Sequence, residues 1–163
     1  MPESDQVKFA AAALRVLVPI DATDRSRWGV QHALRLQREG AEVEVILLHV
    51  GEPVTQWQVL RFRTEREIAR FQSERARFMI DEAGVPLALA GIRFSGVFRQ
   101  GNLPDSILDT AEQMACDRIV MPLPERGPAR HFSRDSVAAV RRRQHHIPVV
   151  AVNGEGVAPD DQQ

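Results

Sequence analysis

The sequence contains little cysteine and lysine and no long apolar run. Cys116 is the single cysteine among 163 residues, which excludes an intramolecular disulfide and favours a reducing compartment. Lysine occurs once, as Lys8, and the formal net charge is −1, so no overall field draws the chain to nucleic acid or an anionic membrane. No apolar stretch approaches the roughly 20 residues that a membrane span needs.

The composition is that of one globular domain, with 44% apolar and 26% charged residues. Glu3 and Asp5 replace the basic start of a signal peptide, so we expect a cytoplasmic protein with a mobile leader at 1–14. A Gly-, Pro- and acid-rich tail at 154–163 is expected to be disordered. The folded domain is therefore predicted to span 15–153.

Strand and helix patterns alternate along this domain. Short apolar, β-branched runs predict five strands, and amphipathic segments between them predict helices. This alternation favours an α/β fold, a parallel sheet with helices on both faces and right-handed crossovers. The predicted strands are Arg15–Ile20, Val43–Val50, Ile92–Arg99, Arg118–Met121 and Ile147–Val152.

Capping residues predict where the helices begin and end. Ser26 is the expected N-cap of the first helix and Gly40 its C-terminal stop, while Asn102 or Leu103 caps a later helix with Pro104 in its first turn. A helix is expected from about Asp135 to His145. A long helix over Leu60–Ala83 is predicted to end at Gly84 and Pro86, with a core-facing stripe of Leu60, Thr64, Ile68, Phe71, Arg75, Phe78 and Met79.

Several short segments resemble one family when they are taken in order. Val18-Pro-Ile-Asp21-Ala-Thr followed by Ser26 is similar to the opening of universal stress proteins, and Leu47-Leu-His-Val50 to their second strand. The chain is therefore identified as a member of that family over about Arg15 to Val152. Further matching segments are Gly101-Asn102, Ile107-Leu108, Asp117–Met121, Ser136-Val137-Ala138 and His146–Val152.

The resemblance implies a single-domain Rossmann-like fold with strand order 3-2-1-4-5 and a nucleotide pocket at the carboxyl ends of the strands. It also implies a homodimer in which the edge strand 147–152 pairs with its copy. The pocket residues carried over are Pro19, Ile20, Asp21, Val50, Met121, Arg126, Gly127, Ser136 and Val137.

The phosphate-binding loop of the family's ATP-binding branch is degenerate here. That branch has M-G-x-x-G-x9-G-[ST], whereas this chain has Pro122, Glu125 and Asp135 at the three glycine positions and keeps Ser136. Glycines let backbone amides approach phosphate, and Pro122 has no amide hydrogen. We therefore expect no tightly bound ATP and no cofactor; the alternative is an ATP-binding member with weak ATPase activity.

Other candidate residues have two interpretations each. Asp21 either contacts an adenine edge, as the resemblance implies, or caps a turn with Thr23. Ser136 either binds phosphate or is a first-turn helix residue. Arg126, Arg130, His131 and Arg134 form either a substitute anion clamp or a solvated loop, and the second interpretation is favoured.

The remaining polar clusters favour ordinary surface or core roles. Arg141–Arg143 lies near a helix C-terminus, where cations are favourable, rather than forming a nucleic-acid site. His145 and His146 point apart and do not predict a metal site, and Cys116 is expected to be a packed thiol. No catalytic signature is present, so we expect a binding or regulatory protein of the stress response, with a possible small-molecule ligand, rather than an enzyme.

Overall fold

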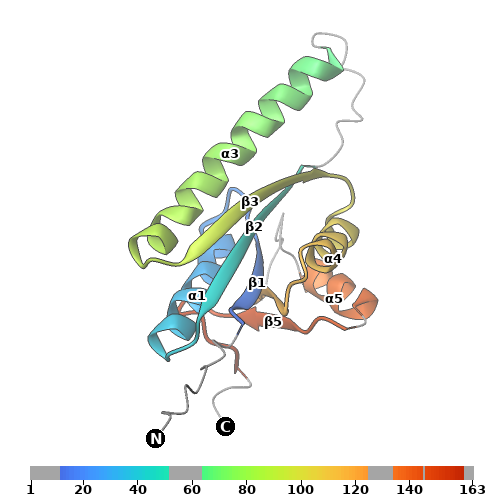
Figure 1. Ribbon diagram of the computed structural model, residues 1–163. Helices are drawn as coiled ribbons and strands as arrows, with labels where there is room; N and C mark the ends of the chain where they lie inside the picture. The colour runs from blue at the N-terminus through green and yellow to red at the C-terminus, as the bar shows by residue number, and fades with distance from the viewer. Residues whose placement is uncertain (1–11, 52–63, 125–133, 145, 160–163) are drawn as a thin grey trace, which may run out of the picture.

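The computed structural model describes residues 12–51, 64–124, 134–144 and 146–159. Its five strands form one parallel sheet in the order β3-β2-β1-β4-β5, which confirms the predicted topology (Figure 1). Each strand begins and ends within two residues of its predicted bounds. The strands are β1 (Leu14–Pro19), β2 (Val43–Gly51), β3 (Arg93–Gln100), β4 (Arg118–Pro122) and β5 (Val149–Val152).

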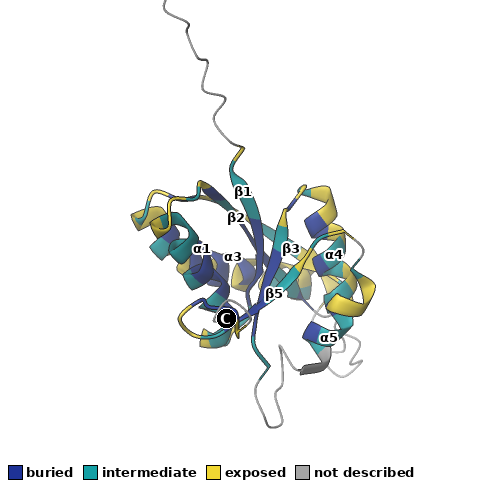
Figure 2. Cartoon of the chain, turned by 90° about the horizontal axis from the view of Figure 1, so that it is seen from below, coloured by how far each residue is buried: buried dark blue, intermediate teal, exposed yellow. Residues whose placement is uncertain are grey.

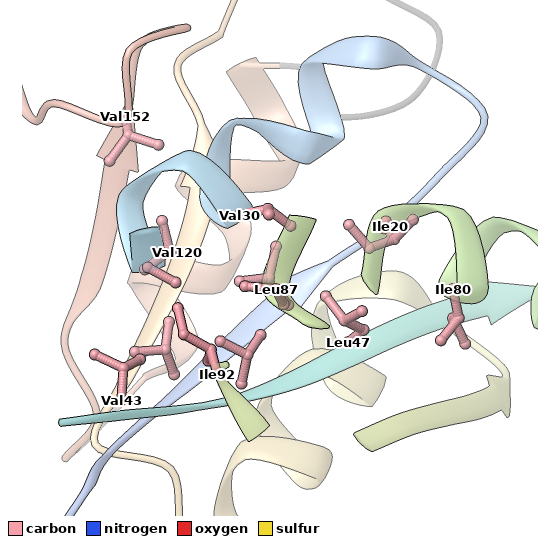
Figure 3. Close-up of a cluster of buried hydrophobic side chains, with 14 of the residues drawn as sticks. Ile20, Val30, Val43, Leu47, Ile80, Leu87, Ile92, Val120 and Val152 are labelled. Carbon is pink, nitrogen blue, oxygen red and sulfur yellow. The ribbon is translucent and has the colours of Figure 1, made fainter. Parts of the chain in front are cut away.

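Helices cover both faces of the sheet because successive strand residues point to opposite sides. Val16 and Val18 of β1 pack with α1 (Trp28–Arg38) and α3 (Glu65–Leu89), in the cluster that Figure 3 shows. Leu17 packs on the other face with α4 (Leu103–Gln113) and α5 (Arg134–Arg143). Figure 2 shows buried residues along the strands between these two helical layers. The fold is therefore the predicted α/β sandwich.

Two of the predicted helix ends are confirmed by their hydrogen bonds. Gly40 has a φ of 98° and its N–H donates to the Gln37 carbonyl, while Ala41 N–H donates to Leu36, which is a Schellman ending. Asn102 caps α4 by accepting from the Asp105 N–H at 3.2 Å.

The predicted N-cap role of Ser26 is wrong. Ser26 lies inside a 3₁₀ turn, η1 (Asp24–Arg27), and is fully buried. Its hydroxyl donates to the Thr23 carbonyl at 2.8 Å, so it closes the turn that follows β1 instead of capping α1. The α-helix begins only at Trp28.

The prediction for the long helix is wrong in two respects. Thr64 is its N-cap in a capping box with Glu67, and the helix runs through Gly84 and Pro86 to Leu89; residues 60–63 lie outside the described part. Of the described residues in the predicted core-facing stripe, only Met79 is buried. The core-facing residues are Ala76, Met79, Ile80, Ala83, Gly84 and Leu87.

Small residues on the buried side of α3 explain this error. A Cβ at Gly84 would lie 2.3 Å from the ring of Phe94, and a Cβ at Gly96 of β3 would lie 2.6 Å from Ile80. The helix therefore lies so close to β3 that its inner face needs small side chains. Its large aromatic residues, which dominate the apolar pattern, consequently point outward.

The chain after β5 folds back onto α1. The Asn153 side chain accepts hydrogen bonds from the N–H groups of Glu155 and Val157, both at 3.0 Å. His32 Nδ1 contacts the Gly156 carbonyl at 2.8 Å, and Val157 and Ala158 are buried. Packing thus continues past the predicted boundary at 153, and the expected disorder does not apply to 154–159; the leader residues 1–11 lie outside the described part.

Candidate functional site

The candidate site lies where β1 and β4 separate at the carboxyl end of the sheet. Paired residues between these strands end at Leu17 and Ile119, whereas β1 stays paired with β2 as far as Pro19. Strand order reverses at β1, because the chain proceeds to β2 on one side and later to β4 on the other. Ligands of open α/β sheets bind at such a switch point.

Asp21 lies two residues after the end of β1 and has one unsatisfied oxygen. Its Oδ1 accepts from the Thr23 N–H at 2.7 Å and from the Thr23 hydroxyl, which matches the turn role, one of the two roles that the sequence left open for Asp21. Its Oδ2 is buried and has no hydrogen-bond partner among the described residues. A buried acceptor of this kind costs free energy until a donor reaches it.

Among the described residues at the end of β4, positions 122–124 offer no free backbone N–H group to a ligand. Pro122 and Pro124 have no amide hydrogen, and the Leu123 N–H already donates to the Val152 carbonyl of β5 at 2.8 Å. Alternate residues of a strand direct their N–H groups to opposite neighbouring strands, so position 122 faces β1. The missing N–H group of Pro122 is therefore on the side of the candidate site between β1 and β4.

Arg25 crosses from η1 to the end of β4. Its guanidinium donates to the Leu123 carbonyl and lies over the Trp28 ring, 5.0 Å from the ring centroid. Both backbone groups of Leu123 are thereby engaged. Neither Arg25 nor Pro124 was among the predicted site residues: the repeated proline was readable from the sequence, but a contact between residues 98 apart was not.

His49 closes the β2 side of the site. Its Nδ1 donates to the Ile20 carbonyl at 2.8 Å, and its ring stacks on Phe98 with centroids 6.1 Å apart. This bond anchors the backbone immediately before Asp21. Val50, the next residue of β2, is partly exposed beside it.

The structure places the predicted pocket residues in three groups. Asp21, Val50 and Ser136 are partly exposed, and the first two lie at the carboxyl ends of neighbouring strands. Arg126 and Gly127 lie outside the described residues, as do Glu125, Arg130 and His131. The side chains that belong to the buried layers are those of Pro19, Ile20, Met121 and Val137.

The other polar clusters do not form a chemical site in the part of the chain that the structure describes. No three His, Cys, Asp or Glu residues there are arranged to hold a metal ion. Arg143 bonds to Asp105 at 2.6 Å and so links α5 to the first turn of α4, which gives this residue of the arginine run a packing role. No described helix has the length and apolar character needed to cross a membrane.

Comparison with known proteins identifies the family. The Universal stress protein family model matches residues 13–153, which is most of the chain. The chain belongs to the universal stress protein family. No curated protein matches it.

Solved structures share this fold at low sequence identity. The hypothetical protein MJ0577 aligns with a TM-score of 0.70 at 21% identity, covering 88% of this chain and 97% of that one. A family protein from Arabidopsis thaliana with AMP bound aligns at 0.59 and 12%, covering 92% and 95%. The universal stress protein from Archaeoglobus fulgidus in complex with dAMP aligns at 0.57 and 16%, covering 85% and 98%.

Proposed function

We propose that this universal stress protein is a binding or regulatory protein that does not hold ATP tightly. The observation that carries the proposal is the backbone of residues 122–124 at the end of β4, where Pro122 and Pro124 have no N–H group and that of Leu123 is already bonded to Val152. A polyphosphate would thus meet no free backbone donor from these residues. Other residues of the protein would have to supply the groups that bind the negative charge of a polyphosphate.

A second candidate function is that the protein binds an adenine nucleotide through the base and hydrolyses ATP weakly. The unpaired Oδ2 of Asp21 favours it, because an exocyclic amino group is a suitable donor for a buried carboxylate. The AMP and dAMP complexes of the two aligned family members give the idea a precedent. In this candidate Asp21 contacts the base, and Ser136 and Arg126 contribute on the phosphate side.

Calorimetric titration distinguishes the two candidates. We expect no saturable heat with millimolar magnesium-ATP, and a micromolar Kd would contradict the main proposal. The double variant Pro122→Gly/Pro124→Gly should increase ATP affinity by returning two backbone donors. If AMP and adenosine bind equally well to the wild type and Asp21→Asn abolishes both, the base-binding candidate is supported.

We also propose a homodimer through residues 147–152. β5 is the edge strand, and its described backbone bonds go only to β4. The Pro148 and Val152 carbonyls accept from the N–H groups of Ile119 in β4 and of Leu123 just after it. The alternation therefore directs the N–H and C=O groups of Val149 and Ala151 outward. These groups can pair with the same strand of a second copy across a two-fold axis.

Proline substitution tests this edge with a matched control. Val149→Pro removes an outward N–H group and should abolish the contact between the two β5 strands, so that the protein sediments more slowly than the wild type, with little change in Tm. Val150→Pro removes a group that faces β4 and should lower the Tm instead. A Val149→Pro protein that keeps its β5 contact, shown by unchanged cross-linking between strands, would contradict the proposal.

A further inference from the structure

The outer side of α3 has a regular stripe of seven residues with alternating spacings of three and four. On a helix such positions share one face, here roughly opposite the buried Ala76, Ile80 and Ala83. Four large apolar side chains of this outer stripe are exposed: Phe71 by 60%, Phe78 by 63%, Val85 by 54% and Leu89 by 85%. The outer stripe is Ile68, Phe71, Arg75, Phe78, Glu82, Val85 and Leu89.

Within the described residues, no helix or strand covers this stripe. The first buried residue of α3 is Ala76, so the N-terminal part of the helix makes no full contact with the sheet. Figure 1 shows this part of α3 extending past the ends of β2 and β3. An apolar stripe on a projecting helix is typical of an interaction surface rather than of a solvated face.

The two charges inside the stripe indicate what covers it. Arg75 and Glu82 lie on either side of Phe78 and have opposite sign. Arg75 has no hydrogen bond or ion pair within the described part of the chain. Glu82 bonds to Arg27 at 2.9 Å through one oxygen, while its side chain stays 47% exposed and its second oxygen can accept another donor.

The stripe is complementary to itself when two copies run antiparallel. A two-fold axis beside Phe78 places Arg75 opposite Glu82 twice, Ile68 opposite Leu89, and Phe71 within one residue of Val85. A parallel arrangement instead sets Arg75 against Arg75 and Glu82 against Glu82, and like charges are destabilising at such contacts. Charge therefore selects the antiparallel pair.

We propose that α3 pairs antiparallel with α3 of a second copy through the outer stripe. The contact is isologous and involves a different edge of the molecule from β5, so it stands independently of the strand-paired dimer. Helix α3 is about 37 Å long at 1.5 Å per residue, which lets the stripe contact its copy over several turns. Phe71, Phe78 and Leu89 are the most exposed apolar side chains that this contact would bury.

Sedimentation analysis in the Val149→Pro background isolates this contact. That protein should still form a dimer, and adding Phe78→Glu should weaken the dimer at least tenfold. Ser73→Glu adds the same charge at an exposed position off the stripe and should leave association unchanged. A Val149→Pro protein that is monomeric at 200 μM, or an association that Phe78→Glu leaves intact, would overturn the proposal. Circular dichroism verifies that each variant remains helical.

A charge exchange tests the antiparallel direction. Arg75→Glu should weaken association because it faces Glu82 of the other copy, and Arg75→Glu/Glu82→Arg should restore it. Failure of the double variant to restore binding would exclude this alignment. Oxidation of Phe78→Cys should link two copies close to the axis, whereas Ser73→Cys should not. Phe78→Cys chains that stay unlinked under oxidation while dimeric would also contradict the geometry.

Discussion

Cys116 shows how burial controls the chemistry of a single residue. The thiol packs beside Ile119 and Ala111 in the layer under α4, and burial raises its pKa to about 11, while the positive charge of Arg15 acts in the opposite direction. A thiol reacts as its thiolate, so this residue is held in its inert form at neutral pH. The packed role expected from the sequence is consistent with this environment.

Cys116 should therefore react with a thiol reagent only after unfolding. At pH 8 we expect negligible reaction of the native protein with Ellman's reagent and one equivalent in guanidinium chloride. Rapid labelling of the native protein would show that the site opens readily. The reagent's absorbance gives the result directly.

The same pKa shift predicts alkaline destabilisation. The unfolded thiol ionises near pH 9 and the folded one near pH 11, so stability is unaffected below pH 9 and falls as pH rises between these values. The loss attributable to this group is at most about 3 kcal/mol. Urea unfolding of wild type and Cys116→Ala at pH 8 and pH 10.5 measures it: the variant should lose less stability across this interval.

At the scale of single elements, the contact between α3 and β3 depends on small residues. Gly84→Ala should stabilise an isolated helix by about 1 kcal/mol. In the protein its Cβ meets the Phe94 ring, and overpacking costs about 1–3 kcal/mol, so we expect a net loss of stability.

A double-mutant cycle checks this interpretation. Gly84→Ala should be less harmful in a Phe94→Leu background, because the clashing ring is gone. Ser73→Ala, at an exposed position of α3 before the helix meets the sheet, is the control for helix propensity alone and should be neutral or slightly stabilising. Equal effects of Gly84→Ala in both backgrounds would show that Phe94 is not responsible.

The helix ends at Gly40 and Asn102 were predictable from the sequence because short-range hydrogen bonds decide them, whereas the local signals at Ser26 and at Gly84 and Pro86 were misleading. The Schellman ending at Gly40 and the cap at Asn102 involve residues within five positions of one another, so the local pattern contains all the information. The inner face of α3 failed because alanine and glycine give a weak apolar signal while Phe71 and Phe78 give a strong one. Only the proximity of β3 decides which side is buried.

The candidate site also contains some residues whose positions were predictable from the sequence and others whose contacts were not. The position of Asp21 near the end of β1 was predictable, since it lies only two residues beyond a strand that the sequence indicates clearly. Arg25 reaches the Leu123 carbonyl from a distant part of the sequence, and only the folded sheet brings the two together. The use of the Leu123 N–H by Val152 likewise depends on strand pairing and has no local signature.

At the scale of the whole molecule, α3 and β5 lie at opposite edges of the sheet arrangement. β3, which packs against α3, is the edge strand on one side and β5 is the edge strand on the other. A protein that uses both surfaces can associate beyond a dimer. The wild type should therefore sediment faster than either Val149→Pro or Phe78→Glu alone, with the double variant slowest.

The short pairing of β1 with β4 also divides the chain into two parts that differ in loop-closure entropy. The Asp117 carboxylate that accepts from the Arg15 N–H lies 102 residues away along the chain, whereas Arg15 and Glu44 are 29 apart. Closing the longer loop costs more entropy, so β4 and β5 should separate from β1–β3 in a partial opening below the global unfolding free energy. In native-state hydrogen exchange, Val120 and Val150 should then exchange faster than Val16 and Leu47. A ligand that contacts both Asp21 and β4 should selectively slow the amide exchange of Val120 and Val150. Exchange rates at these two residues would then report directly whether a ligand occupies the switch point.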